Sequence, residues 1–384
     1  MQNIIDYADM EYRSFDEKPF CRVDSLLLSQ LAYIEIDEIF NNSTKVQDDD
    51  AEKSHSLLNR IEAFFNNDNR LKFLKLSVFD LLKREYFEKM FGNVFTSENT
   101  KALLIAVACS PRFRNMKLAF YVNENDSESE KQFSAITFIL NDASAYVAFR
   151  GTDTSIVGWK EDFNMAYAYP VPAQVAAYKY LDEVADYLPR KLFVGGHSKG
   201  GNLAVYSVLK CRDDVSTRVE SCFSHDGPGF REELVKSDEF KKIEHKVFKT
   251  VPADSIIGML MQNHDHYQVI KSSEMLLGQH DAFTWDVRDL DFVDIEEISK
   301  VAKYTNLTIT QWIENMPSDK GQKFIDELFN LLLASNFTTF TSMKRNWKTA
   351  IPAIYKAIDK MDPDTEKVMK SVFDELALIM WRNL

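Results

Sequence analysis

A serine stands among glycines in residues 195–201, which read Gly-Gly-His-Ser-Lys-Gly-Gly. An apolar run at 192–194 precedes this segment, and apolar residues at helical spacing follow it. A strand, a sharp turn and a helix in this order form a nucleophile elbow, which lifts the serine hydroxyl above the edge of a sheet. Gly196 and Gly200 flank Ser198 where larger side chains would clash in so tight a turn. Four of the chain's 12 glycines gather here, which favours a catalytic turn over a simple connection.

A serine hydroxyl becomes a nucleophile when a base takes its proton, and a carboxylate orients that base. Three histidines lie near a predicted strand at 267–270, downstream of Ser198: His264, His266 and His280. Only His280 follows that strand, and reacting groups gather at the carboxyl ends of parallel strands. We therefore expect His280 to be the base. The His264-Asp265-His266 segment is interpreted as a polar turn, because no third metal ligand at suitable spacing accompanies it. Two further histidines are interpreted as surface or packing residues: His225 and His245.

The strands and helices that must position these groups lie in the middle of the chain, where the later strands alternate with helices. Strands are predicted at residues 117–122, 133–139, 145–149, 192–194, 219–223, 246–248 and 267–270. Helices are predicted at 174–187 and directly after the serine turn. This alternation predicts an α/β fold, in which helices cover both faces of a mostly parallel sheet.

Mainly helical parts are expected on either side of this core. Residues 1–109 form the predicted N-terminal segment, with a helix capped by Asp24-Ser25 and further helices at 71–90 and 100–109. The core is assigned to residues 110–292. Residues 293–384 are predicted to form a helical appendage without strands, with amphipathic segments at 324–333 and 364–381.

Composition restricts the class of protein. The chain has 59 acidic and 46 basic residues and a net charge of −13, which argues against a nucleic-acid partner and against adhesion to an anionic membrane. The four cysteines lack the spacing of a metal site or a disulfide framework, which is typical of free thiols in a reducing compartment. No apolar stretch approaches the roughly 20 residues that span a bilayer, and the first residues do not resemble a signal peptide. We expect a cytoplasmic protein without a transmembrane segment.

Residues 147–152, Val-Ala-Phe-Arg-Gly-Thr, followed by Trp159 and Asp162, resemble the oxyanion segment of class 3 (fungal-type) lipases. Together with Gly-His-Ser-Lys-Gly at 196–200, they make the chain similar to the α/β-hydrolase superfamily. A fuller set resembles a narrower, poorly characterised bacterial family of α/β hydrolases. That set comprises residues 24–31, 149–153, 195–203, 226–230, 279–281 and Trp285. The resemblance covers about residues 1–290.

The resemblance implies a serine hydrolase in which the acid and then the histidine follow the nucleophile along the chain. Two aspartates match positions used for the acid. Asp254 resembles the class 3 lipase position, and Asp226, in Asp-Gly-Pro-Gly-Phe, resembles the pancreatic-type position. The hallmark Asp-Gly-Pro-Gly-Phe stretch favours Asp226, whose alternative role is a turn-forming residue before Gly-Pro. The backbone N–H groups of Lys199 and Thr152 would hold the oxyanion.

The expected reaction is hydrolysis of an acyl ester, as by a carboxylesterase or a lipase, through an acyl-enzyme at Ser198. The substrate would be a small acyl ester or a lipid-like molecule, and neither a metal nor an organic cofactor is needed. Thioesters and amides pass through the same kind of intermediate and stay open as alternatives. Aromatic residues in 153–172 would cover an apolar acyl pocket or belong to the core. A non-catalytic interaction module is the alternative from another class, against which the intact serine turn, the downstream histidine and the two acids weigh.

Overall fold

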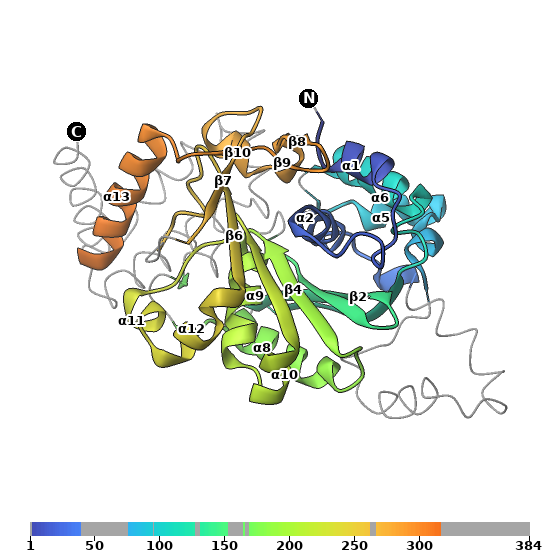
Figure 1. The fold of residues 1–384 in the computed structure, drawn as a ribbon, viewed down its shortest axis with the longest axis horizontal. Helices are drawn as coiled ribbons and strands as arrows, with labels where there is room; N and C mark the ends of the chain where they lie inside the picture. Colours follow the sequence, from blue (N-terminus) through green and yellow to red (C-terminus); the bar gives the residue numbers. More distant parts are fainter. Residues whose placement is uncertain are drawn as a thin grey trace, which may run out of the picture.

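A sheet of eight strands runs through the centre of the protein in the computed structural model (Figure 1). The structure describes residues 2–39, 76–94, 96–126, 131–152, 164–165, 169–261 and 266–315. Along the sheet the strand order is β1-β2-β3-β4-β5-β6-β7-β10. Strands β3 to β7 are parallel, whereas β1, β2 and β3 pair antiparallel at one edge and β10 pairs antiparallel with β7 at the other. The predicted α/β fold with a mostly parallel sheet is confirmed.

Strands β1 to β7 agree with the predicted ones to within a few residues, whereas β10 was not predicted. Their bounds are β1 Lys117–Asp126, β2 Lys131–Asn141, β3 Ser144–Phe149, β4 Lys191–His197, β5 Val219–His225, β6 Val247–Pro252, β7 Gln268–Ile270 and β10 Asp294–Ile295. All residues of β3 are buried, as expected for a strand that is covered on both faces. A separate two-stranded ribbon contains β8 (Val287–Arg288) and β9 (Asp291–Phe292).

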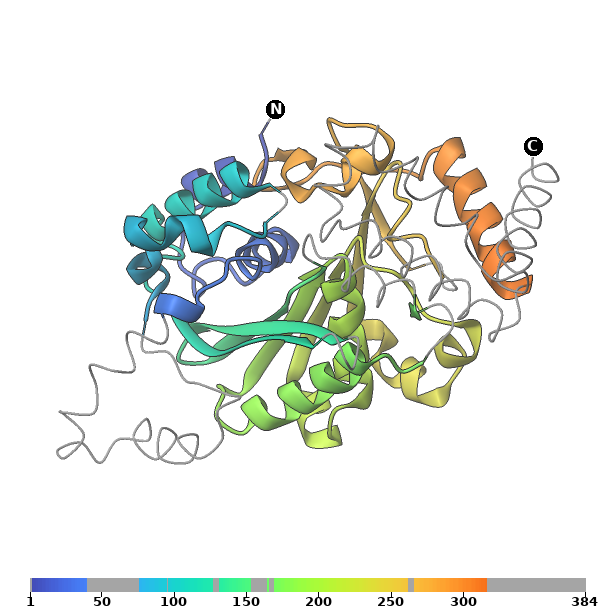
Figure 2. The ribbon, with the colours of Figure 1, turned by 180° about the vertical axis from the view of Figure 1, so that it is seen from behind.

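Helices cover both faces of the sheet (Figures 1 and 2). One face packs against α2 (Arg22–Leu31), and α1 (Ile4–Met10) and α6 (Ser97–Cys109) pack on α2 in the same core. The other face packs against α8 (Pro172–Ala185) and α9 (Lys199–Lys210). The alternation of side chains along β3 separates the two cores. Val147 and Phe149 belong to the core under α8 and α9, whereas Tyr146 and Ala148 belong to the core under α2.

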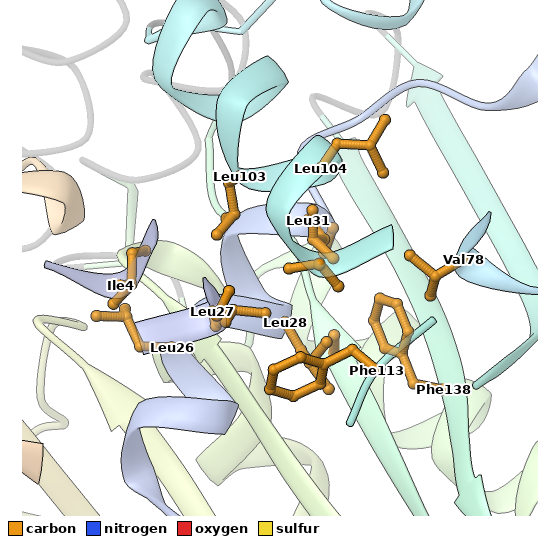
Figure 3. Close-up of a cluster of buried hydrophobic side chains, with 14 of the residues drawn as sticks. Ile4, Leu26, Leu27, Leu28, Leu31, Val78, Leu103, Leu104, Phe113 and Phe138 are labelled. Carbon is orange, nitrogen blue, oxygen red and sulfur yellow. The ribbon is translucent and has the colours of Figure 1, made fainter. Parts of the chain in front are cut away.

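Leucines of α2 form the centre of the core under α2 (Figure 3). Leu26, Leu27 and Leu28 are fully buried, with Ile4 of α1 and Leu103 of α6 in the same cluster. Each buried leucine stabilises the fold by about 1.5–3 kcal/mol relative to an exposed one. The N-terminal helices therefore share one core with the sheet, and this core fixes α2 beside β4.

The remaining helices and turns are short, apart from α13. Their bounds are η1 Val78–Leu81, η2 Arg84–Tyr86, α5 Phe87–Met90, α10 Asp213–Arg218, α11 Glu232–Val235, α12 Asp238–Ile243, η3 Glu244–Lys246, η4 Leu276–His280, η5 Ala282–Thr284 and α13 Lys300–Asn315. Within the described part of the chain, no helix combines the length and the apolar character that crossing a membrane requires.

Three predictions about elements need correction. The helix predicted at 71–90 is wrong over its described residues 76–90, which form two 3₁₀ turns and the four-residue helix α5. Helix α2 begins at Arg22, so that Asp24 lies in its first turn and accepts a hydrogen bond from the backbone N–H of Cys21 at 3.0 Å. The prediction of no strand beyond 293 is wrong at β10. The amphipathic segments 324–333 and 364–381 lie outside the described residues, and the division at 109 and 292 stays a prediction.

Candidate active site

Ser198 lies between the end of β4 and the beginning of α9, in a strained turn. Its backbone has φ 58° and ψ −134°, outside the regions that residues with a side chain normally adopt. Such a conformation persists where the surrounding structure holds it in place. The backbone N–H of Ser198 donates a hydrogen bond of 2.9 Å to the carbonyl oxygen of His225, at the end of β5. The elbow predicted from the sequence is therefore present as a strand, a turn and a helix.

Backbone atoms surround the glycines on either side of this turn. A Cβ atom on Gly200 would lie 2.1 Å from the carbonyl oxygen of Phe149, and one on Gly196 would lie 2.3 Å from the carbonyl carbon of Gly200. Contacts this short with backbone atoms cannot be relieved by a change of rotamer. The close approach of β3, β4 and α9 therefore requires glycine at both positions.

A chain of hydrogen bonds links three side chains at the carboxyl ends of the parallel strands. The Oγ atom of Ser198 lies 3.0 Å from Nε2 of His280, and Nδ1 of His280 lies 2.6 Å from Oδ2 of Asp226. Asp226 follows β5, and His280 is the last residue of η4. The side chain of Asp226 is 1% exposed and that of His280 is 25% exposed. The carboxylate is thus shielded from water, while the imidazole faces the surface beside the serine.

The surroundings of Asp226 keep it in the carboxylate form. Its backbone has φ 49°, and its N–H donates to the carbonyl oxygen of Thr250 at 2.8 Å. The hydroxyl of Ser255 donates a second hydrogen bond to Oδ1. Burial alone would raise the pKa of Asp226, but the hydrogen bond and charge of His280, together with the Ser255 hydroxyl, hold that pKa below its usual range. An ionised carboxylate is the form that orients an imidazole and stabilises its protonated state.

Asp254 has a different partner. Its Oδ2 accepts a hydrogen bond of 3.0 Å from Nε2 of Gln279, and its backbone N–H donates to Oε1 of the same side chain at 2.8 Å. Gln279 is the residue before His280. Both ring nitrogens of His280 already face Asp226 and Ser198. Asp254 therefore holds the residue before His280, and Asp226 is the carboxylate that is hydrogen-bonded to the His280 imidazole.

The segment predicted to hold an oxyanion lies beside the serine. A Cβ atom on Gly151 would lie 3.1 Å from Cβ of Ser198, and the buried residue Thr152 follows directly. Lys199 begins α9, and helix N-termini direct backbone N–H groups outwards. The side chain of Lys199 is buried and donates from Nζ to the carbonyl oxygen of Gln132 at 3.2 Å. Its ammonium group is thus anchored on β2.

A family model described as Mbeg1-like matches residues 107–330. The chain belongs to the Mbeg1-like family. This family is lipase-like, of class 3. No curated protein matches the chain. In this Mbeg1-like chain the matched region contains all the site residues predicted from the sequence: Thr152, Ser198, Lys199, Asp226, Asp254 and His280.

Of the other described histidines of the Mbeg1-like chain, two directly precede site residues and two lie at the surface. His266 is exposed, with Nε2 3.5 Å from a carboxylate oxygen of Glu244, and His264 lies outside the described residues. His245 is exposed and His225 is fully buried, so their interpretation as surface and packing residues is confirmed. Within the described ranges, no group of three or more His, Cys, Asp or Glu side chains is arranged to hold a metal ion.

The aromatic residues predicted at 153–172 and two unpredicted residues beside the linked side chains remain to be placed in the Mbeg1-like chain. Three aromatic residues expected near an acyl pocket lie outside the described residues: Trp159, Phe163 and Tyr167. Tyr169 makes an edge contact with Tyr206, with ring centroids 5.6 Å apart. Sequence reasoning missed Ser255 and His197 as neighbours of the three linked side chains. Ser255 gave no signal, and the only signal for His197 was its place in the glycine-rich turn.

Proposed function

We propose that this protein is a serine hydrolase of the α/β-hydrolase superfamily that cleaves acyl esters through an acyl-enzyme at Ser198. The observation that carries the proposal is the unbroken chain from Asp226 through His280 to Ser198, with distances of 2.6 and 3.0 Å. Its members follow three different strands, at the carboxyl ends of the parallel part of the sheet. The order of serine, acid and histidine along the chain is the order found in this superfamily.

The chemistry follows from the positions of the three side chains. His280 Nε2 takes the proton from Ser198 Oγ as this oxygen attacks the carbonyl carbon of the ester. Asp226, held ionised by its hydrogen bonds, stabilises the imidazolium that forms. The imidazolium then gives its proton to the departing alkoxide. Water repeats the sequence on the acyl-enzyme, and His280 again acts as base and then as acid.

The negative charge on the carbonyl oxygen needs donors that are already in position. The backbone N–H groups of Lys199 and Thr152 are our candidates, because Lys199 directly follows Ser198 and Thr152 follows Gly151, which lies against Ser198. Loss of one such donor in a serine hydrolase costs about 10²–10³ in kcat. The strain at Ser198 supports this role, since the turn that lifts the hydroxyl also begins helix α9 beside it.

Hydrolysis of p-nitrophenyl esters tests the proposal. We expect the wild-type protein to release p-nitrophenol from acyl chains of two to twelve carbons, and we expect Ser198→Ala to be inactive but folded. A matched thioester and a matched anilide show which leaving group the site prefers. Wild-type protein that is inactive on the ester, the thioester and the anilide alike would favour a non-catalytic module. Equal activity of a folded Ser198→Ala variant would show that another residue is the nucleophile.

A further inference from the structure

The residue before the serine has an environment that the proposed reaction does not itself use. His197 is the last residue of β4, and its side chain is buried. Its Nε2 atom lies 2.9 Å from the backbone carbonyl oxygen of His280. The two imidazole rings are 4.7 Å apart between centroids, with 35° between their planes. The ring of His197 therefore contacts both the ring and the main chain of His280, the proposed general base.

The contacts of His197 fix which nitrogen carries the proton. A carbonyl oxygen only accepts hydrogen bonds, so Nε2 of His197 must be the donor in the contact with His280. In a neutral ring Nδ1 is then an acceptor. The hydroxyl of Tyr33, a group that can donate, lies 3.4 Å from Nδ1. Burial lowers the pKa of His197 to about 3, with the neighbouring His280 as a second cause. The ring of His197 thus stays neutral at neutral pH.

The carbonyl that His197 holds belongs to the end of a 3₁₀ turn. The last carbonyl groups of such a turn have no partner within it. His280 ends η4, and the carbonyl of the preceding residue, Gln279, accepts a hydrogen bond of 2.8 Å from the indole Nε1 of Trp285. Two consecutive carbonyls are thus held by two buried aromatic donors, while the side chain of Gln279 is held by Asp254. Of these contacts, the one from His197 acts on the carbonyl of His280 itself, whereas the other two act on its neighbour Gln279.

We propose that His197 is a positioning residue whose Nε2–H group holds the main chain of His280 and thereby sets the distance from its imidazole to Ser198. The inference rests on the proposed hydrolase function and adds a residue to it. A small displacement of the base is costly, since a shift of about 1 Å in a reacting group lowers rates by about 10²-fold. A purely structural histidine would affect stability but leave the rate per folded molecule unchanged.

Two substitutions separate the donor from the bulk of the ring. His197→Gln places an amide nitrogen three bonds beyond Cβ, as Nε2 of histidine is, and keeps a donor for the His280 carbonyl. His197→Met has a similar volume and no donor. The probe is diisopropyl fluorophosphate: the Oγ–P bond forms, the P–F bond breaks, fluoride leaves, and the serine proton passes to His280. Its rate constant, measured by intact mass on protein shown to be folded by circular dichroism, reports the Ser198–His280 pair without any assumption about the substrate.

We expect His197→Met to label about 10- to 100-fold more slowly than the wild type, and His197→Gln to recover to within about fivefold. On p-nitrophenyl butyrate, kcat should fall with little change in KM. A folded His197→Met that labels at the wild-type rate overturns the positioning role and leaves the hydrolase proposal standing. A His197→Gln as slow as His197→Met shows that the donor is irrelevant. Wild-type protein that does not label removes both proposals.

Nitrogen-15 NMR of the wild-type protein gives a second test that needs no variant to fold. We expect the His197 signals to show a protonated Nε2 and an unprotonated Nδ1, unchanged between pH 5 and 9. A proton on Nδ1 would contradict the hydrogen bond to the His280 carbonyl and with it the proposal.

Discussion

The imidazole of His280 receives its carboxylate from Asp226, with 2.6 Å between Nδ1 and Oδ2. Asp254, which follows the next strand of the sheet, binds the side chain of Gln279 instead. The two aspartates thus act on adjacent residues of one loop, one through the reacting ring and the other through the support of that ring. This division gives the two residues different expected consequences on substitution.

Asp226→Asn should lower ester turnover by about 10⁴-fold, because an amide at this position favours the wrong imidazole tautomer, as the equivalent change does in serine proteases. Asp254→Asn keeps an oxygen for Gln279 and should cost less than about tenfold. Turnover of p-nitrophenyl butyrate and the thermal midpoint of both variants are measured side by side. A nearly full rate for Asp226→Asn beside an inactive, folded Asp254→Asn would reverse the two roles.

Ser198→Ala and His280→Ala should each lower kcat by about 10⁶-fold, and the double variant should be no worse than either single one. Residues that act as a unit do not lose activity additively. The half-buried Ser198 hydroxyl contributes little packing, so Ser198→Ala should melt close to the wild type. The two variants that lack His280 should melt lower, because the buried carboxylate of Asp226 loses its imidazole partner. Multiplicative losses in kcat would mean that the two residues act independently.

Lowering the pH should destabilise the protein already at pH values well above the ordinary pKa of carboxylates. Burial lowers the pKa of His225 to about 3, and the charge of Arg22 acts in the same direction. Between pH 6.5 and 3 the unfolded chain therefore binds a proton that the folded chain does not. The free energy of unfolding should fall in this range by up to about 1.4 kcal/mol per pH unit for this residue.

His225→Gln removes one such group. The slope of unfolding free energy against pH should then fall by the amount due to one proton, about 1.4 kcal/mol per pH unit, while His197 keeps its own contribution. Urea unfolding at several pH values between 4 and 8 measures the slope. The comparison uses slopes alone, so a uniform loss of stability in the variant does not affect it. An unchanged slope would show that His225 titrates normally in the folded protein.

Gly200→Ala should destabilise the fold by about 3 kcal/mol or more, since overpacked sites cost 1–3 kcal/mol even where neighbours can move. Its Cβ would lie 2.1 Å from the Phe149 carbonyl oxygen, which cannot move without shifting β3. Gly92→Ala is the matched control, because its nearest contact would be 3.2 Å. Soluble expression and urea unfolding compare the two. Equal stabilities would mean that the turn is looser than its geometry indicates.

Much of this arrangement was predictable, because it depends on local patterns. Apolar runs placed the strands, and glycines around Ser198 predicted the turn. The choice between Asp226 and Asp254 is different, since both follow strands and only the position of the 276–280 loop decides which carboxylate meets the imidazole. The helix predicted at 71–90 failed for a related reason, because helical spacing in 76–90 does not reveal where tertiary contacts will interrupt it. Similarly, nothing local indicates that His197 meets a carbonyl 83 residues away.

The most direct test of the central claim is the site at which a fluorophosphonate attaches to the wild-type protein. After labelling at pH 7.5, tryptic peptides are sequenced by mass spectrometry, with Ser198→Ala and His280→Ala treated in parallel. We predict a single adduct on Ser198, its absence in Ser198→Ala and a strongly slowed reaction in His280→Ala. Absence of an adduct on the folded wild-type protein, or equal labelling of Ser198→Ala, would contradict the assignment of Ser198 as the nucleophile.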